Sequence, residues 1–172
     1  MLSVNKDKIK TLSELSSIVG RYKKSGKTVG LITGCFDVVH IGHITLFQTA
    51  KRHVDILVVG VDNDKSVKLS KGKKRPINNV KNRAFFINSL KDIDYVFVLK
   101  DVFSFKDSTA HITLKKMTQK INPDILITNE KCDSFWQEKK DRAEELKIGY
   151  LNLVPKKIHS STKIVEKLLS EL

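Results

Sequence analysis

Features of secreted, disulfide-bonded and membrane-spanning proteins are scarce in this sequence. Its 172 residues include only two cysteines, Cys35 and Cys132, which are far apart in the chain, and residues 1–10 lack the apolar centre of a signal peptide. No apolar run reaches the ~18 residues that a membrane-spanning helix needs. We therefore expect reduced thiols, no membrane association and a cytoplasmic location.

Acidic residues are also scarce, because 19 Asp and Glu face 32 Lys and Arg and leave a net charge of +13. Such an excess raises the hypothesis of nucleic-acid binding. The cations are dispersed, however. The densest group, between Lys65 and Lys74, is not accompanied by an aromatic RNA-binding signature, zinc-finger spacing or a GXXG loop. A small polyanion such as a triphosphate explains this basic segment as well, so nucleic acid is not the expected partner.

Apolar runs alternate with amphipathic segments along the chain, which is typical of an α/β protein. The runs predict strands at residues 29–32, 54–61, 95–99, 124–128 and 149–154. The segments between them predict helices, and a further helix is predicted over residues 9–22 with Ser13 as its cap. We expect a single domain over residues 1–172, with a leading helix and linker at 1–27. Its core would be a five-stranded, mostly parallel, doubly wound sheet with helices on both faces.

The turn after the first predicted strand carries two histidines. Gly34 ends the strand and a helix begins near Gly42, so His40 and His43 lie at a helix N-terminus. Unpaired backbone N–H groups and the helix dipole favour an anion there, imidazoles add donors, and Gly42 leaves room for a phosphate. The alternatives are two structural histidines or a zinc site, although the zinc motif needs a spacing of four and a third ligand. We predict a phosphate-binding turn.

Other polar residues are candidates for the same site. Asp62 follows the second predicted strand at its carboxyl edge, where it either holds a sugar hydroxyl or helps to start the next helix, a role expected of Asp64. Ser160, Ser161 and Thr162 place hydroxyl groups at the start of the last predicted helix. These three residues either bind a phosphate or only cap that helix.

The histidine turn also carries a family resemblance. Its residues Gly34-Cys35-Phe36-Asp37-Val38-Val39-His40-Ile41-Gly42-His43 resemble the GxFDxxHxGH signature of the cytidylyltransferase-like nucleotidyltransferases. These are Rossmann-like enzymes that transfer a nucleoside monophosphate from a nucleoside triphosphate to a small phosphorylated acceptor. Further segments resemble the heptose 1-phosphate adenylyltransferases. They are Lys71-Gly72, Arg75-Pro76-Ile77-Asn78, Asn82-Arg83, Asp94-Tyr95-Val96, Pro123-Asp124-Ile125-Leu126-Ile127 and Ser160-Ser161-Thr162-Lys163-Ile164.

The resemblance implies roles for the matching residues. His40, His43 and Lys71 would be catalytic, the histidines by stabilising the transition state, and Lys71 and Arg83 would bind phosphates of the nucleotide or the acceptor. The nucleotide pocket would be formed by Gly34, Cys35, Phe36 and Asp37, and the triphosphate would also contact Ser160, Ser161 and Thr162. The implied partners are ATP or CTP, the phosphorylated acceptor and a Mg²⁺ ion held mainly by phosphate and water rather than by protein ligands. Many relatives are dimers, so the resemblance is compatible with a homodimer.

One segment departs from the heptose enzymes. Where they carry a KGGDY-like loop, this chain reads Thr128-Asn129-Glu130-Lys131-Cys132-Asp133. Glycerol 3-phosphate cytidylyltransferases and archaeal FAD synthetases share the histidine signature and differ in this region, so both remain alternatives. A nucleotide- or nucleic-acid-binding module without catalysis is the alternative from another class.

Overall fold

The computed structural model describes residues 8–154, so Ser160, Ser161, Thr162 and the helix predicted after them lie outside it. Five strands form one sheet in the order β3-β2-β1-β4-β5, and every neighbouring pair is parallel. The strands are β1 (Val29–Gly34), β2 (Ile56–Asp62), β3 (Tyr95–Leu99), β4 (Ile125–Thr128) and β5 (Gly149–Asn152). The predicted five-stranded, mostly parallel sheet is confirmed.

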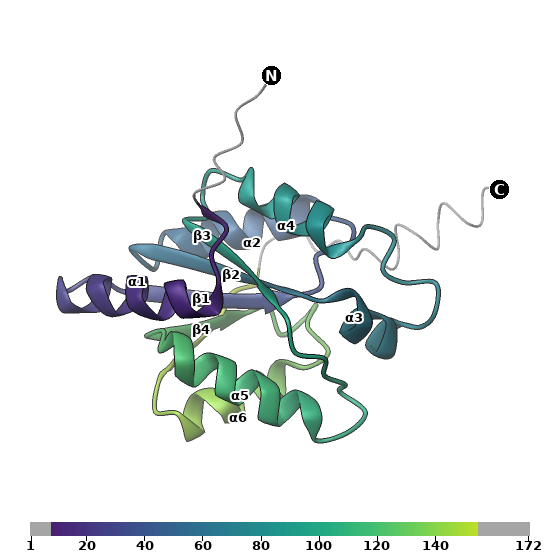
Figure 1. Cartoon of the computed structure of the whole chain (residues 1–172). Helices are drawn as coiled ribbons and strands as arrows, with labels where there is room; N and C mark the ends of the chain where they lie inside the picture. The colour runs from purple at the N-terminus through teal and green to yellow at the C-terminus, as the bar shows by residue number, and fades with distance from the viewer. Residues whose placement is uncertain (1–7, 155–172) are drawn as a thin grey trace.

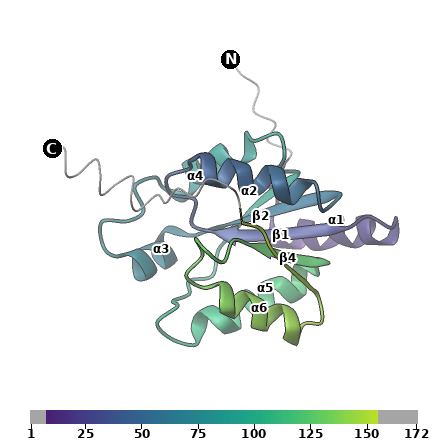
Figure 2. The same cartoon turned by 180° about the vertical axis from the view of Figure 1, so that it is seen from behind.

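Helices cover both faces of the sheet, as predicted (Figure 1, Figure 2). One face carries α2 (Ile41–Lys51) and α4 (Val80–Asn88), and the other carries α1 (Leu12–Lys24), α5 (Thr109–Ile121) and α6 (Trp136–Glu145). The short helix α3 (Asp64–Lys71) follows β2 at the carboxyl end of the sheet. This arrangement leaves the carboxyl ends of the strands open between the two helical layers.

The core explains why the strands were visible as unbroken apolar runs. Successive side chains of a strand point to opposite faces. Leu31 and Val58 therefore pack under α1 and α5, whereas Ile32 and Val59 pack under α2 and α4. All four are almost completely buried. Because both faces are covered, a parallel strand needs apolar residues at every position rather than at alternate ones.

Two helix starts differ from the prediction. The first helix begins at Leu12, not at residue 9, and Thr11 is its cap instead of Ser13. The Thr11 hydroxyl accepts from the Glu14 backbone N–H, and the Glu14 carboxylate accepts from the Thr11 N–H, which completes a capping box. In α3 the cap is Asn63, whose side chain accepts from the Ser66 N–H, so the predicted capping by Asp64 was wrong.

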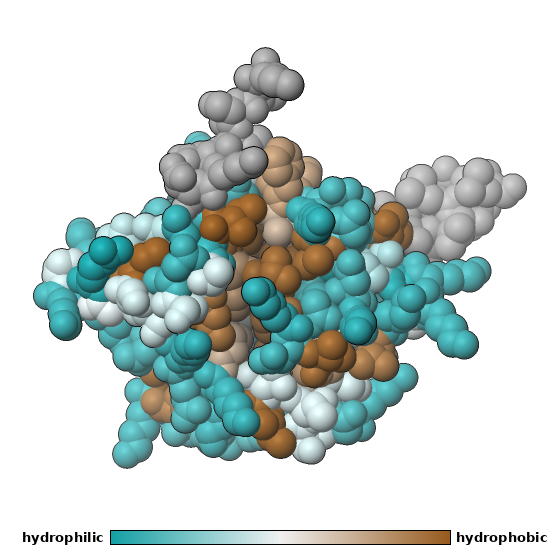
Figure 3. All heavy atoms as spheres, viewed as in Figure 1, coloured by the Kyte–Doolittle hydropathy of each residue, from teal (hydrophilic) through white to brown (hydrophobic). Residues whose placement is uncertain are grey.

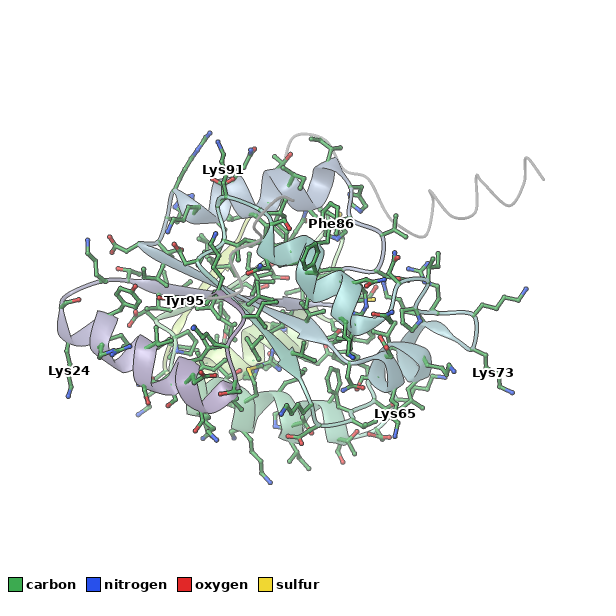
Figure 4. All side chains as sticks on the ribbon, turned by 45° about the horizontal axis from the view of Figure 1, so that its top comes forward. Lys24, Lys65, Lys73, Phe86, Lys91 and Tyr95 are labelled. Carbon is green, nitrogen blue, oxygen red and sulfur yellow. The ribbon has the colours of Figure 1, made fainter. Side chains whose placement is uncertain are left out.

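The basic side chains are spread over the surface. Lys24, Lys65, Lys73 and Lys91 point away from the fold at separate places (Figure 4). Figure 3 shows hydrophilic residues over most of one face, with hydrophobic residues gathered toward its centre. Among residues 8–154, no helix is both long and apolar enough to cross a bilayer.

Candidate active site

A cavity opens where the order of the strands reverses. In an open parallel sheet, ligands bind at the carboxyl ends of the strands on either side of this reversal, which here lies between β1 and β4. The cavity has a volume of about 210 Å³ and is lined by residues from both strands, from β2 and from the helices on both faces. Six predicted site residues line it: Gly34, Cys35, Phe36, His43, Asp62 and Lys71. The fold therefore brings three separate segments of the sequence to one place.

The histidine turn is held by hydrogen bonds between its own residues. The Gly42 N–H donates to Nδ1 of His40 at 3.1 Å, and the His40 N–H donates to Nδ1 of His43 at 3.3 Å. The two rings lie with their centroids 4.0 Å apart at the start of α2. Because Nδ1 accepts in each ring, a neutral imidazole must carry its proton on Nε2. The turn thus presets the tautomer that can donate from Nε2.

His43 remains neutral at physiological pH. Burial, the neighbouring His40 and Lys71 lower the pKa of His43 to about 3. Its ring packs edge-on against Phe36 with a centroid distance of 5.5 Å. The result is a neutral imidazole at the cavity wall that can donate one hydrogen bond from Nε2.

The turn before the histidines is shaped by Gly34 and Phe36. Phe36 has a positive φ of 49°, which is unusual for a bulky side chain, and its ring folds back over Gly34. A Cβ added at Gly34 would lie 3.1 Å from the Phe36 ring. Gly34 is therefore needed for the close approach of this ring, which in turn supports His43.

Asp37 organises a neighbouring loop and is not among the cavity-lining residues. Its buried carboxylate accepts from the backbone N–H groups of Ile77 and Asn78 at 2.9 and 2.8 Å. It also pairs with Nε of Arg75 at 2.6 Å. The predicted contribution of Asp37 to the pocket is thus indirect, because it fastens the segment 75–78 to the histidine turn.

Arg83 is also placed behind the cavity. It is 1% exposed, and its nitrogens bind protein groups. Nη1 donates to the carbonyl of Cys35 at 2.5 Å, and Nη2 donates to the carbonyl of Asp62 at 2.8 Å and to Oδ1 of Asp64 at 2.6 Å. Nε donates to the carbonyl of Asn78 at 2.9 Å. Arg83 therefore ties the ends of β1 and β2 to α3 and to the loop before α4, and its predicted contact with a phosphate stays a prediction.

Charged groups meet at the end of β2. Burial raises the pKa of Asp62 to about 6, although Lys139, Arg83 and Lys71 act in the opposite direction. Lys71 is the last residue of α3 and is exposed at the cavity rim. Burial also raises the pKa of the Cys35 thiol, which argues against a thiolate nucleophile there.

The opposite wall contains none of the predicted site residues, although it includes the segment 128–133, whose departure from the heptose enzymes is visible in the sequence. Asp133, in the loop after β4, accepts from Thr128 Oγ1 at 2.6 Å, from Lys139 Nζ at 2.5 Å and from the Phe135 N–H at 3.0 Å. Burial alone would raise the pKa of Asp133, but Lys139 and these hydrogen bonds hold it below its usual value. The position of this loop could have indicated the wall. A loop that follows β4 lies at the carboxyl edge of the sheet beside β1, where the strand order reverses and ligands bind.

The rest of this wall comes from α6 and from the loop before α5. Phe105 stacks on Phe135 with ring centroids 3.6 Å apart and planes 8° apart, and both line the cavity. Glu138 and Arg142 of α6 line it as well. Among residues 8–154, no group of three or more His, Cys, Asp or Glu side chains could hold a metal ion.

Comparison with known proteins identifies the family. The model of the family described as cytidylyltransferase-like matches residues 31–167, which is most of the chain. The chain belongs to this family. Enzymes of the family generally use a divalent metal together with a nucleoside triphosphate.

Individual relatives agree with this assignment. The chain is 35% identical over 164 residues to the bifunctional protein HldE of Sulfurimonas denitrificans, covering 95% of this chain and 31% of that protein. It is also 35% identical to the bifunctional protein HldE of a Nitratiruptor strain, with 94% and 32% covered. The chain thus spans about a third of the length of these curated relatives.

Solved structures share the fold. A lipopolysaccharide core biosynthesis protein from Thermoplasma volcanium superposes with a TM-score of 0.59 at 24% identity, over 77% of this chain and all of that one. Pantothenate synthetase from Thermus thermophilus superposes with a TM-score of 0.60 at 12% identity, over 89% of this chain and 63% of the other. These likenesses support the Rossmann-like architecture.

Proposed function

We propose that this protein is a nucleotidyltransferase that transfers AMP from ATP to a sugar 1-phosphate of the heptose type and releases pyrophosphate. The observation that carries the proposal is the neutral His43, held at a helix N-terminus with its proton on Nε2, at the wall of a cavity that also contains Lys71. Family membership and the relatives named HldE support the reaction class. The choice of acceptor rests on the resemblance to the heptose 1-phosphate adenylyltransferases.

The reaction needs charge stabilisation more than covalent help. An oxygen of the acceptor phosphate attacks the α-phosphorus of ATP, the bond from that phosphorus to the β-phosphate oxygen breaks, and the electron pair leaves with pyrophosphate. Nε2–H of His43 donates to an oxygen on the reacting phosphate as negative charge grows there. The dipole at the N-terminus of α2 favours negative charge at the same place, while the N–H groups of Gly42 and His43 are already bonded within the turn. Because the pKa of His43 is about 3, it serves as a hydrogen-bond donor and not as a general acid.

Other residues position the reactants. Lys71 supplies a positive charge at the rim for the β- and γ-phosphates, whose charge increases as pyrophosphate leaves. We assign Arg83 a positioning role, because its guanidinium already binds three carbonyl groups and Asp64. His40 is a second donor of the turn, and the contribution of Ser160, Ser161 and Thr162 to triphosphate binding stays a prediction.

A Mg²⁺ ion fits this site as a companion of the triphosphate. The cavity contains the carboxylate of Asp62 but no cluster of ligands among the described residues, and magnesium characteristically keeps phosphate oxygens and water as most of its ligands. Bound to the triphosphate, the ion would neutralise charge on the leaving group. Asp62 is the residue that would contact it or its water molecules.

Pyrophosphate release with defined substrate pairs tests the proposal. We would incubate the protein with Mg²⁺, either ATP or CTP, and one of three acceptors: a heptose 1-phosphate, glycerol 3-phosphate or FMN. The proposal expects release with ATP and the heptose phosphate, and a nucleotide-linked sugar as the second product. Pyrophosphate release with CTP and glycerol 3-phosphate would instead indicate a glycerol 3-phosphate cytidylyltransferase, and release with ATP and FMN would indicate an FAD synthetase. No release with any pair, together with salt-dependent binding of labelled RNA that ATP does not displace, would support a binding module.

A further inference from the structure

One cavity-lining cation has no hydrogen-bond or ion-pair partner in the described part of the chain. The side chain of Arg142 on α6 is only 1% exposed, and its Nε is buried without a hydrogen-bond partner. Within residues 8–154, no carboxylate lies within 4.0 Å of its guanidinium group, although the group belongs to the cavity wall. Burying an uncompensated charge is strongly unfavourable, so its presence at a binding cavity calls for an explanation.

The buried Arg83 and the half-buried Lys139 are both paired. Arg83 donates to three carbonyl groups and to Asp64, and Lys139 donates to Asp133 and to the carbonyl of Thr33. Burial lowers the pKa of Arg142 to about 10, so the guanidinium stays charged at neutral pH. Arg142 is thus a full positive charge that the wall holds without a direct partner.

Three carboxylates influence Arg142 from a distance. Asp133 is occupied by Lys139 and Thr128, and Glu145 pairs with Lys115 at 3.0 Å on the outside of the helix. Glu138 lies one turn before Arg142 on α6 and lines the same cavity. It is the internal group that could compete with a ligand for Arg142, and the experiment below includes it for that reason.

We propose that Arg142 binds a second anionic group of the acceptor, either a carboxylate or a phosphate, that is distinct from the phosphate receiving the nucleotide. The acceptor is then an acidic or doubly phosphorylated relative of heptose 1-phosphate, which itself has no second anion. This inference rests on the proposed nucleotidyl transfer, since it concerns the same cavity. His43 comes from α2 on one face of the sheet and Arg142 from α6 on the other, and both line this cavity. An acceptor that spans it places its reactive phosphate at the histidine turn and its second anion at Arg142. Arginine suits this task because it grips carboxylate or phosphate with two parallel hydrogen bonds.

The test uses inorganic phosphate and malonate as probes for the two kinds of anion. The protein is first saturated with Mg²⁺ and a non-hydrolysable ATP analogue, and its melting temperature is then measured against the concentration of each anion. The variants are Arg142→Met and, as a matched control, Arg21→Met, which removes an exposed arginine of α1. We expect one anion to stabilise the wild type and Arg21→Met equally. Arg142→Met should need about 10- to 100-fold more of it. The anion that acts identifies the group as carboxylate or phosphate.

Three outcomes overturn the inference. They are an equal response of all three proteins, no response of the wild type to either anion, or a structural role of Arg142. A structural role would show itself without added anions. Arg142→Met and Glu138→Gln would then each lower the melting temperature, and the double variant would melt at about the same temperature as either single variant. If the ATP analogue stabilises the wild type but the anions do not distinguish Arg142→Met, only this inference fails. If the analogue stabilises none of the proteins, the proposed function fails with it.

Discussion

The two walls of the cavity differ in how completely their polar groups are satisfied. On and behind the wall formed by the histidine turn, Nδ1 of His40 and His43, the carboxylate of Asp37 and the guanidinium of Arg83 all bind groups of the protein. On the wall formed by α6, Asp133 and Lys139 are paired, but Arg142 is not. The first wall is therefore organised before any ligand binds, whereas the second holds the positive charge of Arg142, which an anionic ligand would pair with. Preorganised donors suit stabilisation of the reacting phosphate, and an unpaired guanidinium suits recognition of an anionic acceptor.

The largest effect is expected from His43→Ala, which removes the central donor of the organised wall. Because this donor faces charge that grows in the transition state, kcat for pyrophosphate release should fall by about 10²- to 10³-fold with little change in KM for ATP. The matched control is His53→Ala, which changes an exposed histidine after α2. An unchanged kcat in His43→Ala would remove the histidine turn from the mechanism.

Arg83→Met tests whether the same wall depends on its buried guanidinium. The substitution leaves three carbonyl groups and Asp64 without their donor, so we expect the free energy of unfolding to fall by about 3 kcal/mol in urea denaturation. Lys81→Met, at an exposed position of the same helix, should change stability little. A stable Arg83→Met protein with a raised KM for ATP would instead restore the phosphate-binding role that the sequence suggested.

Lys71→Met should have a smaller effect that is confined to the nucleotide. Lys71 is exposed at the rim, and one solvated charge contributes less than a buried one. We expect KM for ATP to rise about tenfold, with an unchanged KM for the acceptor. Lys73→Met is the control, because this side chain points away from the fold (Figure 4). A raised KM for the acceptor would instead indicate that Lys71 binds the acceptor and not the nucleotide.

The smallest effect concerns Asp62, which lies between the two walls. Its pKa rises from 3.8 to about 6 on folding, so the folded protein holds this proton more tightly than the unfolded chain. Ionisation of Asp62 therefore costs stability as the pH rises through this interval. The full shift would correspond to about 2 kcal/mol between pH 4 and pH 7. Because the Asp62 side chain is only half-buried, we expect the wild type to lose about 1 kcal/mol relative to Asp62→Asn, measured by urea denaturation. Asp101→Asn, at an exposed position, should show no such trend, and a parallel pH dependence of wild type and Asp62→Asn would contradict a desolvated carboxyl.

The sequence predicted the fold well because the strands are buried on both faces. Apolar runs such as the one around Leu57 and Val58 are visible without any knowledge of the partners. Helix starts were less certain, since Thr11 and Ser13 are both good caps. The contacts that hold the segment before α1 against Val96, a bridge from Ile9 and a hydrogen bond from the Lys10 N–H, are not visible in the sequence. The single domain over residues 1–172, the cytoplasmic location and the homodimer stay predictions.

The candidate site could be predicted only in part. The histidine turn is contiguous in the sequence, so its geometry could be inferred from a strand end, a glycine and a helix start. The α6 wall is assembled from Phe105, Asp133 and Arg142, which meet only because of the sheet order. The hydrogen bonds of Arg83 were hidden for a related reason, since its partners are mostly backbone carbonyl groups that no residue pattern reveals.

The central claim is that one cavity holds the nucleotide at the histidine turn and leaves the α6 wall for the acceptor. A crystal structure with Mg²⁺ and a non-hydrolysable ATP analogue tests this most directly. We expect an α-phosphate oxygen within hydrogen-bonding distance of Nε2 of His43, Lys71 beside the outer phosphates, and no nucleotide atom bound to Arg142. A triphosphate seated on Arg142, or bound away from the histidine turn, would contradict it.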